Sequence, residues 1–139
     1  MPIPRPPKLQ VKAAALNPVD HKMAQHGFML QATPVVLGCD VAGVVQAVGS
    51  KVQGVKAGDR IMAFTPLGTP GYGAFAEQCL AAGDMVLAMP DGLSFEDAAA
   101  LPVALGTALL GLCQELKVAA SPADKVCWRR ARAVPFFWI

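Results

Sequence analysis

The residue types that bind metals or form disulfides are few in this sequence and widely spaced. The four cysteines include no C-x-x-C pair: Cys39, Cys79, Cys113 and Cys127. A disulfide framework or a structural zinc site is therefore not predicted, and reduced thiols are expected. His21 and His26 stand five residues apart, whereas two ligands on one helical face are three or four apart. We predict no metal site.

Five side chains in the N-terminal third of the sequence have polar or reactive groups that could do chemistry. Asn17 can cap a helix whose first residue is Pro18, with Asp20 at the position of a capping-box acid. Lys22 can relay a proton or polarise a carbonyl, or it can be a solvated surface lysine. In the Cys39-Asp40 pair, the thiol can be a small buried hydrophobe and the carboxylate can serve a turn or a hydrogen bond.

A glycine-rich stretch at residues 68–73 (GTPGYG) has the composition of a phosphate-binding loop. Phosphate loops, however, follow a strand and open a helix, and no helical pattern follows this stretch. We therefore interpret residues 68–73 as a hairpin loop.

The elements that would position these residues are mostly short strands. Residues 9–15 alternate in the period of a strand, and the valine-rich run 34–48 favours a buried strand. Further strands are expected at 61–65, 74–80 and 85–88, which is typical of a small barrel or sandwich. A short helix should run from Pro18 to about Gly27.

Helices are expected after the strands. Ser94 is a good helix cap, and Pro102 can open a second helix. This second helix carries apolar residues at helical spacing: Leu105, Leu109, Leu112 and Leu116. The apolar stretch 98–113 is shorter than the ~20 residues of a membrane span, and we interpret it as buried helix.

Composition excludes several classes of function. The 139 residues suit one compact domain, and 54% hydrophobic against 16% charged residues argues against disorder. A net charge of +2 is too small to favour nucleic acid or anionic membranes as partners. The first residues lack the apolar core of a secretory signal, so a cytoplasmic location is expected.

Several motifs, in the right order, resemble the medium-chain dehydrogenase/reductase superfamily. They lie at residues 14–20 (AALNPVD), 37–45 (LGCDVAGVV), 48–49 (VG), 58–61 (GDRI), 73–77 (GAFAE), 89–91 (MPD) and 99–108. Zinc-dependent members place a Cys in the first motif and a His-Glu pair in the second, where this chain has Asn17 and Cys39-Asp40. The resemblance is therefore to the zinc-independent branch of quinone oxidoreductases and enoyl reductases, and in particular to fungal trans-acting enoyl reductases that serve polyketide synthases.

This resemblance implies hydride transfer from NADPH to an α,β-unsaturated carbonyl such as an enone or a polyketide-type substrate. The Asn of the family's first motif lines the nicotinamide and substrate pocket, which maps to Asn17. The Thr of the helix motif meets the nicotinamide carboxamide, which maps to Thr107. Lys22 can face the same cleft as a catalytic residue. The choice between NADH and NADPH and the identity of the substrate stay open.

The resemblance also implies a fold class and a domain organisation. Residues 1–117 correspond to the GroES-like, partly open β-barrel on the substrate side, mainly β with C-terminal helices and with part of its N-terminal strands missing. Residues 118–139 are an atypical tail where the family's dinucleotide-binding domain would begin. We therefore expect a truncated reductase that is inactive alone, or that depends on a protein partner or another copy of itself. The alternative is a non-enzymatic module that binds a synthase or a full-length reductase.

Overall fold

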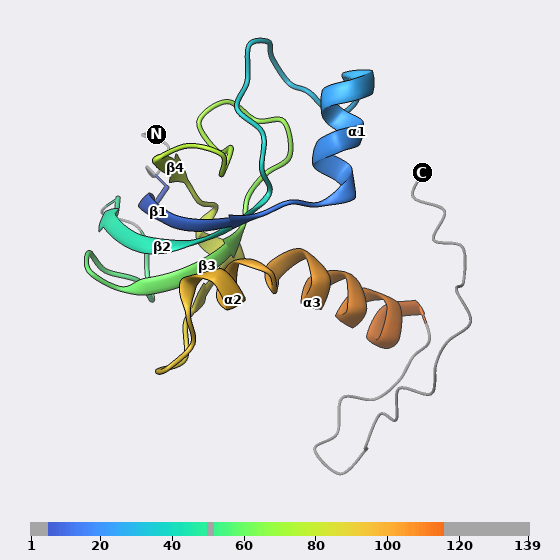
Figure 1. Cartoon of the computed structure of the whole chain (residues 1–139). Coiled ribbons are helices and arrows are strands. Elements are labelled where there is room, and N and C mark those ends of the chain that lie inside the picture. The colour runs from blue at the N-terminus through green and yellow to red at the C-terminus, as the bar shows by residue number, and fades with distance from the viewer. Residues whose placement is uncertain (1–5, 50–51, 116–139) are drawn as a thin grey trace. The chain divides into compact units, whose positions relative to one another are not determined.

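An antiparallel sheet forms the body of the protein (Figure 1). The computed structural model describes residues 6–49 and 52–115, and the chain divides into two units with the boundary after Thr107. The strands are β1 (Lys8–Ala15), β2 (Asp40–Ala47), β3 (Arg60–Phe64), β4 (Gln78–Leu80) and β5 (Val86–Ala88). The helices are α1 (Pro18–His26), α2 (Phe95–Ala99) and α3 (Pro102–Leu109), with one 3₁₀ turn at Gly83–Met85 and a π-helical segment at Leu110–Glu115.

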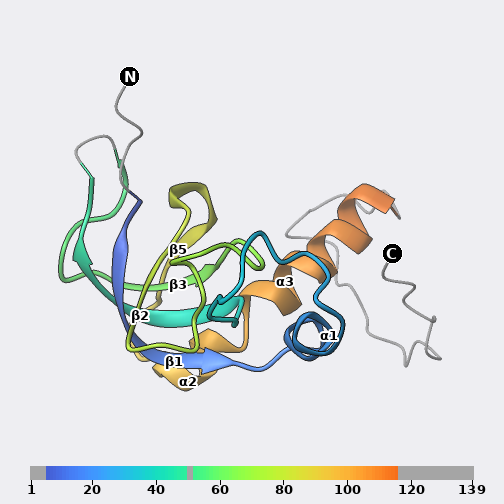
Figure 2. The same cartoon turned by 90° about the horizontal axis from the view of Figure 1, so that it is seen from above.

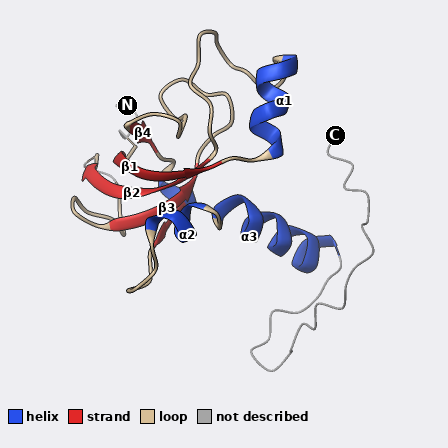
Figure 3. Cartoon of the chain, in the orientation of Figure 1, coloured by secondary structure: helices blue, strands red, loops and turns tan. Residues whose placement is uncertain are grey.

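The five strands lie in the order β4-β1-β2-β3-β5, and every pair is antiparallel. The long strands β1 and β2 form the centre, and α1 follows the end of β1 (Figure 2). The secondary-structure colouring shows few helices beside this sheet (Figure 3). The predicted mainly β architecture with helices toward the C-terminus is confirmed.

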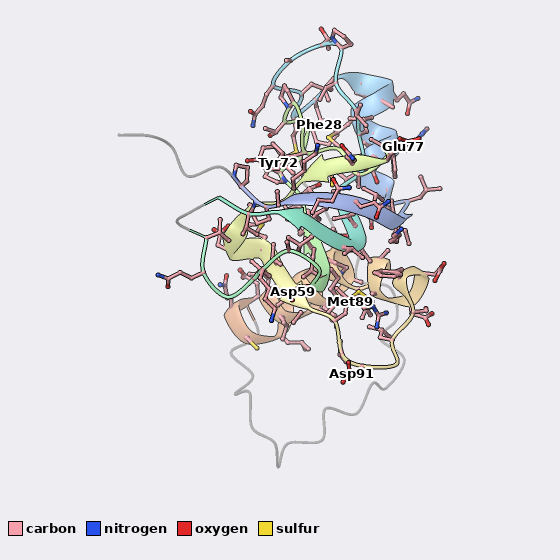
Figure 4. The ribbon with its side chains drawn as sticks, turned by 90° about the vertical axis from the view of Figure 1, so that its left-hand side faces the viewer. Phe28, Asp59, Tyr72, Glu77, Met89 and Asp91 are labelled. Atoms are coloured by element: carbon pink, nitrogen blue, oxygen red, sulfur yellow. The ribbon has the colours of Figure 1, made fainter. Side chains whose placement is uncertain are left out.

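Alternating side chains place a core on each face of the sheet, because successive residues of a strand point to opposite faces. Along β3, Ile61 and Ala63 belong to one buried cluster, and Met62 between them belongs to the other. The second cluster includes Met89 and residues of α2, which contacts β1, β2 and β3. Met89 accordingly lies on the α2 side of the strands (Figure 4).

The strand predictions were right in number but wrong in extent. The valine-rich run becomes a strand only from Asp40, and only Gln78–Leu80 of the expected strand 74–80 is a strand. The hairpin expected at residues 68–73 is also wrong, because β4 pairs with β1 rather than with β3. This loop therefore leads past β2 and β1 from β3 to the edge strand β4, and its Gly68 carbonyl accepts the N–H of Gln31 at 3.0 Å.

Helix α1 begins and ends where its local signals predict. Asn17 is the N-cap, Pro18 is the first helical residue, and the backbone N–H of Asn17 donates to Asp20 Oδ2 at 2.9 Å. The helix stops at Gly27, which has a left-handed φ of 68° and donates its N–H to the Met23 carbonyl.

Replacing Gly27 with alanine should therefore destabilise the fold by about 1 kcal/mol, because alanine is strained at positive φ. A Cβ at this position would meet no atom within 4 Å, so the backbone alone carries the cost. Asparagine, which tolerates this conformation better, should recover part of the loss. Equilibrium urea unfolding measures both variants, and an alanine variant as stable as the wild type would contradict the prediction.

The expectation of a wholly buried apolar helix at residues 98–113 is wrong. Ala98 and Ala99 of α2 are buried, but Leu105 of α3 is 45% exposed. The division of these residues into two helices, with the second opened by Pro102, is as predicted. Leu116, the last member of the predicted apolar stripe, lies outside the described residues.

Candidate functional site

The start of α1 is fixed to the segment before β2 by the carboxylate of Asp20. Its Oδ2 atom accepts the backbone N–H of Asn17, and its Oδ1 atom accepts that of Gly38 at 3.2 Å. Asp20 is only 4% exposed, so both contacts are sheltered from water. Hydrogen bonds to a carboxylate are stronger than neutral ones, and these two hold Asn17 close to the Cys39-Asp40 pair.

The side chain of Asn17 points at that pair. Its Nδ2 atom donates to Asp40 Oδ2 at 3.0 Å and lies 3.5 Å from Cys39 Sγ. The other oxygen of Asp40 accepts the backbone N–H of Val103 at 3.0 Å. Asp40 is 1% exposed, and its burial raises the pKa of the carboxyl group to about 6. Asn17 is therefore held by an acceptor that has almost no contact with water.

Gly38 brings Phe75 against the same segment. Gly38 has a φ of 98°, and a Cβ there would lie 2.8 Å from Cδ1 of the Phe75 ring. The Phe75 N–H also donates to the Leu37 carbonyl at 3.0 Å, and the buried hydroxyl of Thr65 donates to the Gly38 carbonyl at 3.0 Å. Only glycine fits here, because this position needs both a positive φ and room for the ring.

These contacts form one wall of an open cleft of about 430 Å³. The cleft is lined by Leu16, Asn17, Asp20, His21, Ala24, Leu37 and Phe75. Its apolar rim is accessible to solvent, since Leu16 is 84% and Phe75 is 41% exposed. A mostly apolar cleft with a few fixed polar groups is typical of a small-molecule site, in which the polar groups set the orientation of the ligand.

The Cys39 thiol next to Asn17 is not suited to act as a nucleophile. Burial, together with the negative charges of Asp20 and Asp40, raises its pKa to about 12. Burial likewise raises the pKa of Cys79, the middle residue of β4 and a member of the buried core, to about 11. Both thiols are therefore protonated at neutral pH.

We expect Cys39 and Cys79 to resist a thiol reagent such as 5,5′-dithiobis(2-nitrobenzoate) at pH 8 in the native chain and to react after denaturation. The physical reason is that the thiolate is the reactive form and neither side chain is accessible. Peptide mapping by mass spectrometry identifies the labelled positions, and each cysteine-to-serine variant serves as the control. Rapid native labelling of Cys39 would contradict this account of the site.

The structure brings only part of the predicted site together. Among the described residues, Asn17 lines the cleft, whereas Lys22 is exposed on α1 and Thr107 is half-buried on α3, and neither is among the lining residues. The roles of Lys22 and Thr107 stay predictions. His21, weighed from the sequence only as a metal ligand, and Phe75, noted there only as part of a family motif, also line the cleft.

The described residues offer neither a metal site nor a membrane-spanning helix. Within residues 6–49 and 52–115, no three His, Cys, Asp or Glu side chains lie where they could hold one metal ion. Of the helices in that part of the chain, none combines the length and the apolar content that crossing a bilayer requires.

Comparison with known proteins gives consistent results. Residues 7–91 match the alcohol dehydrogenase GroES-like domain. The chain is 37% identical over 145 residues to the trans-enoyl reductase tazE of Aspergillus terreus, covering 93% of this chain and 47% of that protein. It thus spans less than half the length of this curated relative.

Solved structures share the fold. An alcohol dehydrogenase superfamily protein from Novosphingobium aromaticivorans superposes with a TM-score of 0.74 at 30% identity, covering 85% of this chain and 36% of that one. The Escherichia coli quinone oxidoreductase complexed with NADPH gives a TM-score of 0.68 at 28% identity, covering 81% and 33%. Since the matched domain spans well over half of the residues, this chain belongs to the alcohol dehydrogenase GroES-like domain family, within the medium-chain dehydrogenase/reductase superfamily.

Proposed function

We propose that this chain forms the substrate-side wall of the active site in an NAD(P)H-dependent enoyl or quinone reductase. The observation that carries the proposal is the Asn17 carboxamide, which lines a mostly apolar cleft and is held in place by Asp40. The names of the relatives support it, since they include a trans-enoyl reductase and a quinone oxidoreductase complexed with NADPH. The proposed substrate is an apolar α,β-unsaturated carbonyl compound, such as an enone or a polyketide-type acyl chain.

The described residues offer groups that suit the nicotinamide end of NAD(P)H, but none that suit its pyrophosphate. A neutral carboxamide beside an apolar wall suits a nicotinamide ring and an enone lying together. The pyrophosphate needs backbone amides at a helix N-terminus after a parallel strand, and the described strands are all antiparallel. The glycine-rich loop offers no such cradle, because Gly68 and Gly73 are packed against the backbone of Met29 and Val36. We propose that residues outside the described ranges, or another chain, hold the phosphates.

NADPH, when bound, supplies the hydride that is transferred to the β-carbon of the unsaturated carbonyl. The residues of this chain then have three tasks. Asn17 orients the reacting groups through hydrogen bonds without adding a charge. The apolar side chains of Leu16, Leu37 and Phe75 exclude water. A proton is then delivered to the α-carbon, and Lys22 of α1, which is exposed and not among the residues that line the cleft, is the proposed donor.

The test is a titration of the purified chain with a short enone, 3-penten-2-one, and separately with NADPH, followed by nuclear magnetic resonance. We expect the enone to shift signals of Asn17, His21 and Phe75, and NADPH to bind weakly. Asn17→Ala should abolish the enone-induced shifts, whereas Gln25→Ala, on the exposed part of α1, should not. Enone binding elsewhere would contradict the proposed cleft. Tight NADPH binding would show that the phosphate site lies within this chain. If the chain binds a synthase but no enone, the alternative of a non-enzymatic binding module is favoured.

A further inference from the structure

One buried carboxylate contacts two parts of the chain that are far apart in sequence. Asp40, the first residue of β2, accepts the side-chain amide of Asn17 on one oxygen and the backbone N–H of Val103 on the other, both at 3.0 Å. An ionised carboxylate can only accept hydrogen bonds, so the nitrogen of the Asn17 carboxamide must face it. The contact therefore determines which way round the carboxamide lies.

The second contact compensates for a missing cap. Helix α3 begins at Pro102, and the residue before it is Leu101, whose side chain cannot accept a hydrogen bond. The first N–H groups of a helix have no partner within the helix. Asp40 accepts one of them, and its negative charge lies at the positive end of the helix dipole. Asp40 thus acts as the N-terminal cap of α3, although it precedes Val103 by 63 residues in the chain.

We propose that Asp40 is a positioning residue, whose single carboxylate sets both the orientation of Asn17 in the cleft and the first turn of α3, which leads to Thr107. Thr107 follows Val103 by four residues and so lies about one turn further along the same helical face. Asp40 is not among the residues that line the cleft, so it acts through these two neighbours. The inference rests on the proposed function, because that function gives Asn17 and Thr107 their importance.

Asparagine cannot replace Asp40 in this position. Its side chain has one acceptor and one donor group, whereas both neighbours of Asp40 are donors. In Asp40→Asn, one neighbour must therefore face an N–H₂ group and lose its hydrogen bond. The reciprocal double variant, Asn17→Asp with Asp40→Asn, restores a matched arrangement. The introduced asparagine can accept from Val103 and donate to the carboxylate at position 17.

The experiment is amide hydrogen exchange of the full chain, observed by nuclear magnetic resonance. In Asp40→Asn we expect exchange to accelerate about tenfold at the Val103 N–H, at the side-chain amide of Asn17, or at both. The Val45 N–H, which binds the Asp59 carbonyl at 2.9 Å, is the internal reference and should not change. Asp91→Asn, at an exposed turn labelled in Figure 4, is the matched control.

The double variant distinguishes positioning from simple loss of stability. It should restore wild-type exchange at Val103, but it should not restore the signal shifts that 3-penten-2-one induces in the cleft, because residue 17 then carries a charge. Unchanged exchange at both sites in Asp40→Asn would overturn the proposal, as would a double variant that leaves Val103 unprotected. If Asp40→Asn does not fold, the double variant alone decides the question.

The two proposals fail in different ways. If the wild-type chain neither binds nor reduces an enone, the proposed function is wrong, and the exchange data still decide whether Asp40 couples Asn17 to α3. If the wild-type chain binds the enone in the cleft and Asp40→Asn binds it equally tightly with the same signal shifts, the positioning role is wrong and the proposed function stands.

Discussion

Replacing Gly43 with alanine is expected to destabilise the fold by about 3 kcal/mol or more, the largest effect that we predict for a single methyl group. Gly43 lies in the middle of β2, opposite Val11 of β1. An added Cβ would overlap the backbone carbonyl oxygen of Gln10. That oxygen belongs to the central strand β1, which pairs on both sides, so it cannot move without disturbing the sheet.

Gly83→Ala is the matched control for this prediction. Gly83 begins the 3₁₀ turn before β5, its φ is not left-handed, and a Cβ there would meet no atom within 4 Å. The control should therefore unfold at nearly the wild-type urea concentration, while Gly43→Ala should unfold at a far lower one or fail to fold. Equal stability of the two variants would mean that β1 and β2 are not paired in this register.

The second large effect concerns the dependence of stability on pH. Burial raises the pKa of Asp40 to about 6, from an ordinary value of 3.8. The folded state therefore binds the proton more tightly than the unfolded state. The contribution of Asp40 to stability is complete below pH 4 and is lost as the pH rises through 6. We expect this group to lower the free energy of unfolding by about 1 to 3 kcal/mol over that interval.

Asp40→Asn isolates this contribution, because the amide does not titrate. Urea unfolding at several pH values between 4 and 7 should show a decline for the wild type that is absent or much smaller for the variant. Every other titratable group is present in both proteins, so its contribution cancels to first order in the difference. A constant difference across the interval would show that Asp40 is solvated like an ordinary aspartate.

The two ends of helix α1 could be predicted from the sequence, because the residues at each end specify them. Pro18 at the first helical position, with Asp20 three residues after the cap, predicted the start of α1, and Gly27 predicted its end. The extent of the strands could not be predicted, because it depends on a partner. The valine-rich run before Asp40 has strand-like composition, yet its carbonyls at Leu37 and Gly38 bind Phe75 and Ala74 instead of a neighbouring strand.

In the candidate site, too, some residues could be predicted from the sequence and others could not. Asn17 could be proposed because it lies in a motif that resembles a known family; it lines the cleft, and its role toward a cofactor stays a prediction. The role of Asp40 could not be identified, because nothing near residue 40 indicates that α3 starts beside it. The glycine-rich loop was misread as a hairpin because composition predicts a turn but not which strands it connects.

The outermost strands of the sheet, β4 and β5, are each only three residues long. An edge of that length exposes too few unpaired backbone groups to template the addition of a strand from a neighbouring molecule. Within the described residues, β4 and β5 themselves therefore offer little on which fibrils of stacked strands, which grow by such templating, could nucleate in the native state. If the protein aggregates at high concentration, the contacts between molecules should involve exposed apolar side chains such as Leu16. A mild detergent should then dissolve the aggregates.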